Sequence, residues 1–198
     1  MYNMARDMMK VVVINARPRR GGLISQMLGR IVAALPPECR VDVLSVCDLQ
    51  VKHCTGCMRC RSLGRCVLPE DDAHCVAELI RACDALIVGS PCYWGAMPGQ
   101  TKALFDRMVY ALMGERPNGM PLPLHRGKPA VVVATSNTAW PFNVWFHQTS
   151  GVIRSLKEIF RWSGFRLAGT LQKGGCRKRG ALTPREIAKC KKLARKIG

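Results

Sequence analysis

Short runs of apolar residues alternate with longer amphipathic stretches along the whole chain. The apolar runs lie at residues 10–15, 41–46, 84–89, 130–135 and 165–171, and several of them are rich in β-branched residues. The most continuous of these runs have no polar position between apolar ones, which is typical of strands covered on both faces of a sheet. The pattern therefore predicts five parallel strands.

The stretches between these runs carry the signals of helix ends. Gly22 precedes the first stretch, Pro98 opens the third, and Thr183 with Pro184 has the residue types of an N-cap and a first helical turn. We expect a linker rich in proline and glycine at residues 114–129. Helices are expected at residues 23–35, 70–83, 98–113, 146–162 and 183–197.

Strands that alternate with helices predict an α/β protein. The strands should form a doubly wound five-stranded parallel sheet with helices on both faces. No internal repeat and no sign of a second domain is present in the sequence, so residues 1–198 are expected to form one domain.

Length and composition support a globular protein. The chain has 198 residues, 48% of them hydrophobic, and a mean hydropathy of +0.01, which exclude a disordered or a membrane-spanning chain. The first ten residues lack the apolar core of a signal peptide, and eleven cysteines suit a reducing compartment. We therefore expect a cytoplasmic protein that does not contact the membrane.

The net charge of +18 is unusual, and much of it lies near the C-terminus. Residues 173–198 contain ten lysines or arginines and one acidic residue, Glu186. Such a cluster is compatible with a nucleic-acid partner, with attraction of anionic cofactors, or with a solvated basic helix over residues 183–197. No aromatic residue follows Phe165, which counts against base stacking and therefore against a nucleic-acid partner.

Four cysteines fall within thirteen residues, in a cysteine-rich loop at residues 53–69. They are Cys54, Cys57, Cys60 and Cys66, with the spacing C-x2-C-x2-C-x5-C. Bacterial ferredoxins use a related C-x2-C-x2-C-x3-C-P run, whereas zinc sites usually present two well-separated ligand pairs. The spacing favours an iron–sulfur cluster over zinc, and a redox-active thiol pair or a metal-free loop remains as an alternative.

Three predicted loops follow the carboxyl ends of strands, where ligands bind in sheets of this type. The loop after the first strand carries Arg17, Arg19 and Ser25 before a helix N-terminus, a combination that suits a phosphate group. This loop contains neither G-x-x-x-x-G-K-[ST] nor G-x-G-x-x-G, so it is not a nucleotide-hydrolysing P-loop or a dinucleotide fingerprint.

The other two loops offer groups that suit a flat ring. Tyr93 and Trp94, in the glycine-rich loop after the third strand, present aromatic faces, and the glycines allow close approach of the backbone. Residues 135–137 after the fourth strand supply hydroxyl and amide groups. Together the three loops predict a site for a phosphorylated ring compound.

Two segments resemble a known family. The segment GSPCYWGAMPGQTKALFDR at residues 89–107 is similar to the GSP-x-Y-(F/W)-x-x-x-x-G-x-x-K-x-(F/L)-x-DR signature of flavodoxin-like NAD(P)H-dependent FMN reductases. The segment CTGCMRCRSLGRCVLPEDD at residues 54–72 resembles the compact cysteine motif of the iron–sulfur flavoproteins, a branch of the same superfamily. The resemblance implies a flavodoxin-like fold with strand order 2-1-3-4-5 and FMN at the carboxyl edge of the sheet.

The resemblance also implies roles for individual residues. The FMN phosphate would be held by Arg17, Arg19 and Ser25. The isoalloxazine ring would be lined by Pro91, Cys92, Tyr93, Trp94 and Gly95 and, on another side, by Thr135, Ser136 and Asn137. In the iron–sulfur branch the four cysteines bind a [4Fe-4S] cluster near the flavin, and the family commonly forms homodimers or tetramers.

The first loop departs from the family pattern G-S-P-R-x-x-G-N-T. Arg17 stands in place of the serine, and Leu23 and Ile24 stand in place of the Asn-Thr pair. The chain therefore lacks two of the family's hydroxyl donors and offers arginine charge and backbone N–H groups in their place.

These observations predict an FMN-dependent oxidoreductase. Electrons would pass from NAD(P)H, or from ferredoxin if a cluster is present, through FMN to an acceptor that the sequence does not identify. Because FMN carries the chemistry, no catalytic residue of the protein is required. Two alternatives remain open: a metal-bearing nucleic-acid-binding protein, and a flavodoxin-like scaffold that has lost FMN.

Overall fold

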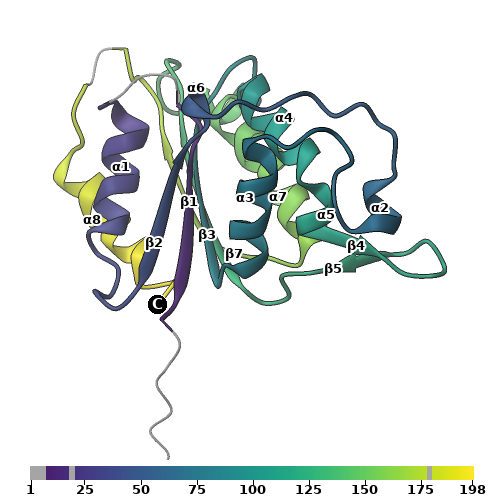
Figure 1. Cartoon of the computed structure of the whole chain (residues 1–198). Helices are drawn as coiled ribbons and strands as arrows, with labels where there is room; N and C mark the ends of the chain where they lie inside the picture. The colour runs from purple at the N-terminus through teal and green to yellow at the C-terminus, as the bar shows by residue number, and fades with distance from the viewer. Residues whose placement is uncertain (1–7, 18–20, 178–179) are drawn as a thin grey trace, which may run out of the picture.

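The computed structural model describes residues 8–17, 21–177 and 180–198 (Figure 1). Within these residues five parallel strands form one sheet in the order β2-β1-β3-β6-β7. The strands are β1 (Lys10–Asn15), β2 (Arg40–Ser45), β3 (Ala85–Pro91), β6 (Pro129–Thr135) and β7 (Arg166–Lys173). Numbered within the sheet alone, this order is 2-1-3-4-5, and the predicted doubly wound, flavodoxin-like fold is confirmed.

Helices cover both faces of the sheet (Figure 1). One face is covered by α1 (Leu23–Val32) and α8 (Pro184–Ala194). The opposite face is covered by α3 (Asp72–Ala82), α4 (Gly99–Arg107), α5 (Val109–Leu112) and α7 (Thr149–Ser163). The sheet is therefore the middle layer of three.

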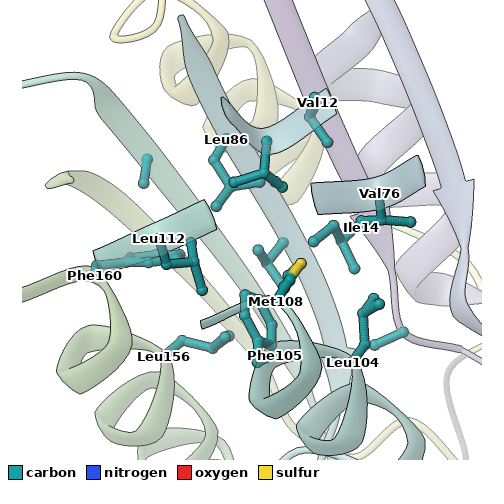
Figure 2. Packing of buried hydrophobic residues seen from close by; sticks show 14 of the residues in the cluster. Val12, Ile14, Val76, Leu86, Leu104, Phe105, Met108, Leu112, Leu156 and Phe160 are labelled. Atoms are coloured by element: carbon teal, nitrogen blue, oxygen red, sulfur yellow. The ribbon is translucent and has the colours of Figure 1, made fainter. Parts of the chain in front are cut away.

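Alternate residues of the central strands supply the two cores. Val11 and Val13 pack under α1 and α8, whereas Val12 and Ile14 pack on the other face, and all four side chains are almost completely buried. Figure 2 shows the second cluster, in which side chains from β1 and β3 meet those of α3, α4 and α7. Complete burial of such side chains contributes roughly 1.5–3 kcal/mol each, which explains why the strands are apolar on both sides.

The intervening segments differ in part from the prediction. The predicted helix over residues 98–113 is divided at Met108 (φ −101°, ψ 22°) into α4 and α5. The predicted linker contains an antiparallel hairpin of β4 (Met113–Glu115) and β5 (Pro121–Pro123). The predicted helix from residue 146 begins only at Thr149, after the short α6 (Phe142–Trp145), because His147 has a φ of 54° that no helix continues.

One short helix precedes the cysteine loop and another lies within it. The loop lies between η1 (Val46–Asp48) and α3 and contains α2 (Cys60–Leu63). Thr183 is the N-cap of α8, as predicted, and its hydroxyl accepts a hydrogen bond from the Glu186 N–H. Among the described residues, no helix combines the length and the hydropathy needed to cross a membrane.

The strand register aligns the carboxyl ends that matter for the site. Asn15 of β1 pairs with Gly89 of β3, and Pro91 at the end of β3 pairs with Thr135 of β6. Thr135 in turn pairs with Lys173, the last residue of β7. The loops that follow these four strands therefore leave the same edge of the sheet.

Candidate functional site

A cavity of about 490 Å³ opens at this carboxyl edge. Its volume is in the range of small-molecule and cofactor sites. We call it the edge cavity. It is lined by Arg17, Leu23, Ile24, Pro91, Cys92, Tyr93, Thr135, Ser136, Asn137, Cys176 and Arg177.

The edge cavity brings together residues of all three loops that the sequence indicated. Of the predicted cofactor residues, seven line it: Arg17, Pro91, Cys92, Tyr93, Thr135, Ser136 and Asn137. Trp94 and Gly95, in the turn between Tyr93 and Ala96, and Ser25 are not among its lining residues, and the Ser25 hydroxyl accepts a hydrogen bond from the Asn15 side-chain amide at 3.0 Å. Arg19 lies outside the described residues.

Sequence reasoning missed a fourth loop, which follows β7. Cys176 and Arg177 line the edge cavity, and the Cys176 N–H donates to the Ser136 carbonyl at 3.1 Å. The rule that ligands bind beyond strand carboxyl ends could have indicated this loop, because β7 ends at the same edge. Both residues lie in the basic C-terminal segment, whose most evident feature in the sequence is its charge.

The N-terminus of α1 faces the site without a capping side chain. Its N-cap is Gly22, no acidic residue occupies the first turn, and a Cβ atom built on Gly22 would fall 0.7 Å from Nη1 of Arg17. The Arg17 guanidinium therefore occupies the space that only glycine leaves open. Free backbone N–H groups at a helix N-terminus together with a guanidinium form an anion-binding arrangement, which fits the phosphate of FMN.

A second observation also fits a polar ligand near this helix. The side-chain oxygen of Asn15, at the carboxyl end of β1, is buried and has no hydrogen-bond partner among the described residues. Native proteins rarely leave such an acceptor unsatisfied, and unpaired buried groups concentrate at functional sites. An unpaired acceptor requires a donor, so this oxygen suits a hydroxyl or N–H group of a ligand and not the phosphate oxygens, which are themselves acceptors.

The ring end of the site is a tight turn with an unusual backbone. The Tyr93 N–H donates to the Ala96 carbonyl at 2.9 Å, and the Ala96 N–H donates back at 3.0 Å. Both central residues have positive φ angles, 53° at Trp94 and 75° at Gly95. A left-handed conformation costs a residue such as tryptophan about 1–2 kcal/mol, and strained backbone of this kind occurs mostly at functional sites.

The turn presents its aromatic residues outward. The Trp94 side chain is fully exposed, and Tyr93 is about half exposed while it lines the edge cavity. The turn rests on α7, because a Cβ atom on Gly151 would fall 1.9 Å from the Gly95 carbonyl oxygen. Glycine at position 151 is therefore what allows the backbone of the turn to lie against the helix.

Thiol groups near the turn are held in the neutral form. Burial raises the pKa of Cys92, whose Sγ donates to the Gln148 side-chain oxygen at 3.3 Å. Burial likewise raises the pKa of Cys176, against the opposing effect of nearby cations such as Lys173. Neutral thiols make these parts of the cavity wall suited to contact with a ring and not to nucleophilic attack.

The four cysteines of the C-x2-C-x2-C-x5-C motif line a separate, smaller cavity of about 60 Å³, which we call the cysteine chamber. Burial, followed by the charges of Cys66, Cys54 and Cys57, raises the pKa of Cys60, so the four thiols interact electrostatically. A hydrogen bond from the Arg59 backbone lowers the pKa of the exposed Cys57.

The described residues contain no group of three or more His, Cys, Asp or Glu side chains arranged to hold a single metal ion. The four cysteines nevertheless line one small cavity. Four cysteines can hold an iron–sulfur cluster or a zinc ion, and it is their compact spacing in the sequence that favours the cluster.

Comparisons with known proteins show the family of the chain. The family model of the NADPH-dependent FMN reductases matches residues 9–163. An iron–sulfur flavoprotein from Clostridioides difficile is 26% identical over 192 residues, which is 96% of this chain and 78% of that protein. An iron–sulfur flavoprotein from Methanosarcina thermophila is 35% identical over 102 residues, which is 51% of this chain and 53% of the relative, so that match spans only about half of either protein.

Solved structures share the fold across nearly the whole chain. Smu.1420 from Streptococcus mutans has a TM-score of 0.69 at 21% identity and covers 94% of this chain and 97% of its own. An FMN-dependent NADH-azoreductase from Bacillus anthracis, solved in complex with FMN, has a TM-score of 0.70 at 13% identity and covers 95% of this chain and 97% of its own. At these identities the structural similarity shows the fold alone.

Proposed function

We propose that this chain, which belongs to the NADPH-dependent FMN reductase family, is an iron–sulfur flavoprotein that transfers electrons from NAD(P)H through bound FMN to an acceptor. The observation that carries the proposal is the edge cavity, in which residues from four loops that are far apart in sequence meet at the carboxyl edge of the sheet. FMN, when bound, supplies the hydride and electron chemistry, and the protein supplies binding and orientation.

The residues at one end of the edge cavity would hold the phosphate. Arg17 and the N-terminal N–H groups of α1 would bind its oxygens, with Arg19 and Ser25 as further donors. The support is the combination of an uncapped helix N-terminus with a guanidinium held over Gly22. These groups take the place of the hydroxyl donors that Leu23 and Ile24 cannot provide.

The residues at the other end would orient the ring. The proposed ring-binding residues are Pro91, Cys92, Tyr93, Trp94 and Gly95 of the turn and Thr135, Ser136 and Asn137 of the neighbouring loop. The strained turn would present backbone and aromatic groups to the ring, and the exposed Trp94 would exclude water once the site is filled. The hydroxyl and amide groups after β6 would satisfy the polar edge of the ring.

We further propose that Cys54, Cys57, Cys60 and Cys66 hold a [4Fe-4S] cluster, with ferredoxin as an alternative electron donor to NAD(P)H. The sulfur donor set of the cysteine chamber and the names of the relatives support this assignment. We expect the whole protein to have a single domain, to be cytoplasmic and to form a homodimer or tetramer.

Anaerobic purification followed by FMN titration tests the central proposal. We expect a yellow protein that binds FMN with quenching of its fluorescence and then oxidises NADPH or NADH. Assays for iron and acid-labile sulfide report on the cluster independently. A colourless protein that neither retains nor takes up FMN would refute the redox function, and stoichiometric zinc in such a protein would favour the nucleic-acid-binding alternative.

A further inference from the structure

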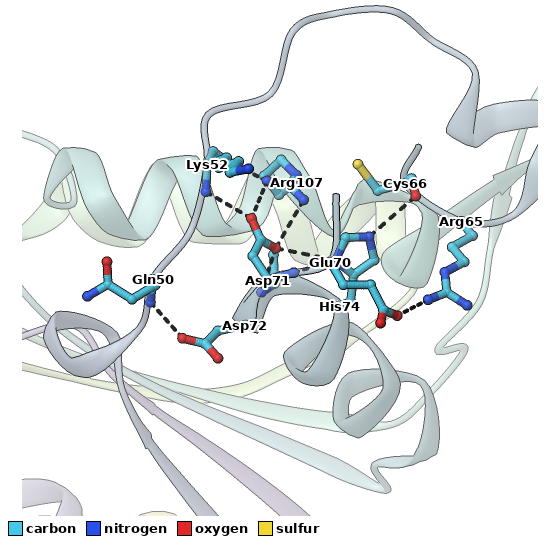
Figure 3. Close-up of polar contacts among 10 residues, drawn as sticks. Gln50, Lys52, Arg65, Cys66, Glu70, Asp71, Asp72, His74 and Arg107 are labelled. Carbon is cyan, nitrogen blue, oxygen red and sulfur yellow. Dashed lines mark hydrogen bonds and ion pairs between the residues drawn. The ribbon is translucent and has the colours of Figure 1, made fainter. Parts of the chain in front are cut away.

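One buried ion pair lies beside the cysteine chamber, and Figure 3 shows its surroundings. Arg107, the last residue of α4, donates from Nη1 to Oδ2 of Asp71 at 2.7 Å and from Nη2 to Oδ1 at 3.1 Å. Arg107 is 1% exposed, and the Asp71 side chain is 7% exposed. A bidentate pair shielded from water fixes both side chains in one orientation.

This pair holds the residue at which the cysteine loop begins. The Lys52 N–H donates to Oδ2 of Asp71 at 2.9 Å, and the Lys52 carbonyl accepts from Nη1 of Arg107 at 2.7 Å. Both backbone groups of one residue are therefore bound by the two partners of the ion pair. The start of the loop cannot move without breaking two charge-assisted hydrogen bonds.

The same cluster holds the residue at which the cysteine motif ends. His74 accepts a hydrogen bond at Nδ1 from the Asp71 N–H at 3.2 Å, so its Nε2–H donates to the Cys66 carbonyl at 3.3 Å. Burial lowers the pKa of Arg107, but its hydrogen bonds with Asp71 and with the Cys66 thiol raise it more, and the net shift is upward. Arg107 and Cys66 both line the cysteine chamber, and His74, which is bound to Asp71, holds the Cys66 carbonyl.

One hydrogen-bond donor of Arg107 has no acceptor among the described residues. Its Nε–H is buried and has no acceptor among the described residues, and Arg107 lines the cysteine chamber. A buried N–H without an acceptor is costly, and an anionic occupant of the chamber would provide an acceptor. The guanidinium is therefore placed both to shape the chamber and to contact what fills it.

We propose that Arg107, oriented by Asp71, is the positioning residue of the cysteine chamber, because it fixes both ends of the loop so that the four thiols face one cavity before any metal binds. The role of the chamber as a cluster site rests on the proposed function, but the positioning of the thiols does not. Without the Arg107–Asp71 pair, the ends of the loop would separate. Binding of metal and sulfide would then have to supply the free energy that brings the four cysteines together.

Thiol alkylation of the metal-free protein tests the positioning directly. In Arg107→Met, we expect the half-buried Cys60 and Cys66 to react with iodoacetamide about tenfold faster than in the unaltered protein, as measured by mass spectrometry of each peptide. Cys83 and Cys190 are fully buried in the two cores and serve as internal controls whose rates should not change. Unchanged alkylation rates at Cys60 and Cys66 would overturn the proposal. An equal rise at these two cysteines and at the two buried controls would overturn it as well.

Reconstitution with ferrous iron and sulfide provides the second readout. We expect Arg107→Met to lose about tenfold in iron bound per chain at limiting iron, while its FMN affinity stays within about threefold. Glu186→Gln is the matched control, since it disrupts an ion pair on the opposite face of the sheet, in which buried Lys173 lies 2.8 Å from the partly exposed Glu186. Equal iron loss in the two variants would contradict a specific role for Arg107.

The outcomes separate this proposal from the cluster assignment. If the unaltered protein binds no iron, the cluster is refuted, and the alkylation rates alone decide the positioning role. If Arg107→Met does not fold, Arg107→Lys decides the question, since lysine keeps the charge but lacks the planar fork that binds both carboxylate oxygens of Asp71. We then expect faster alkylation of Cys66 in the lysine variant, and a rate equal to that of the unaltered protein would overturn the proposal.

Discussion

At the scale of single residues, two glycines determine how the edge cavity is built. Gly22 leaves room for the Arg17 guanidinium at the N-terminus of α1, and Gly151 leaves room for the Gly95 carbonyl at the start of α7. In both places a methyl group would meet another part of the proposed FMN site. The absence of side chains at these positions is therefore as informative as the presence of Tyr93 or Ser136.

Gly22→Ala should weaken FMN binding. The added Cβ would displace the Arg17 guanidinium, and the loss of a charge-assisted hydrogen bond to phosphate lowers affinity by about 10- to 100-fold. Fluorescence titration with FMN measures the change. Gly29→Ala in the same helix is the control, because a Cβ there meets nothing within 4 Å. An FMN affinity equal to that of the control would contradict the placement of the phosphate.

Gly151→Ala should destabilise the protein although it lies within a helix. Alanine in a helix usually stabilises by about 0.5–1 kcal/mol over glycine, but here the Cβ would collide with the backbone of the Trp94–Gly95 turn. We expect the free energy of unfolding to fall by about 1–3 kcal/mol in urea titrations, with weaker FMN binding as well. A stabilised variant would show that the turn can move without cost.

At the scale of elements, the sequence predicts the sheet well and the connections poorly. The five apolar runs became the five strands. The central strands β1, β3 and β6 are apolar on both faces because both faces are buried, whereas the edge strands β2 and β7 are only partly buried. The break at Met108, the β4–β5 hairpin and the left-handed His147 depend on how distant segments pack, and the local pattern gives no sign of them.

The candidate sites show the same division. Topology and residue type indicated three of the four loops that form the edge cavity, and the cysteine spacing indicated the chamber. The Arg107–Asp71 pair could not be predicted, because its partners are 36 residues apart and each resembles an ordinary charged residue at a helix end. Only the fold shows that their charges are buried together.

The segment between the hairpin and β6 should make stability depend on pH. His125 is buried, contacts the Ala111 carbonyl through Nε2 at 2.8 Å and stacks on Phe165. Burial lowers the pKa of His125 below its ordinary value of 6.5, with a smaller opposing effect of the carbonyl. The folded state therefore binds fewer protons than the unfolded state just below pH 6.5, and stability falls as the pH drops through this range.

Urea unfolding of His125→Phe and of the unaltered protein at pH 7.5, 6.5 and 5.5 measures this effect. A shift of one pKa unit corresponds to about 1.4 kcal/mol of stability. We expect the unaltered protein to lose stability relative to the variant as the pH falls. The lowered pKa values of Asp71 and Glu186 act only in more acidic solution, below the ordinary values of 3.8 and 4.5. Parallel pH profiles of the two proteins would exclude the contribution of His125.

At the scale of the whole molecule, exposed aromatic residues gather beside the edge cavity. Trp140, Trp145 and Phe146 are 78%, 66% and 64% exposed, and Phe142 packs against Trp145 and Phe146. Their segment is next to the Trp94–Gly95 turn, since a Cβ on Gly95 would lie 3.3 Å from the His147 carbonyl. Exposed apolar patches of this kind usually mark association surfaces, which supports the proposed homo-oligomer.

Trp140→Ser combined with Trp145→Ser should therefore dissociate the oligomer. We expect light scattering coupled to size exclusion to report a larger assembly for the unaltered protein and a monomer for the double variant. Trp162→Ser is the control, because this half-exposed tryptophan lies at the far end of α7. A monomeric unaltered protein, or an unchanged mass in the double variant, would rule out this surface as the interface.

Helix α4 also constrains how the sequence can change in length. It begins at Gly99, just after the Tyr93–Ala96 turn, and ends at Arg107, so nine residues connect the two sites. Each inserted or deleted residue would rotate Arg107 by about 100° around the helix axis, out of phase with Asp71. Length variation should thus be confined to places such as the exposed tip of the β4–β5 hairpin. The number of residues between the turn and Arg107 should stay constant.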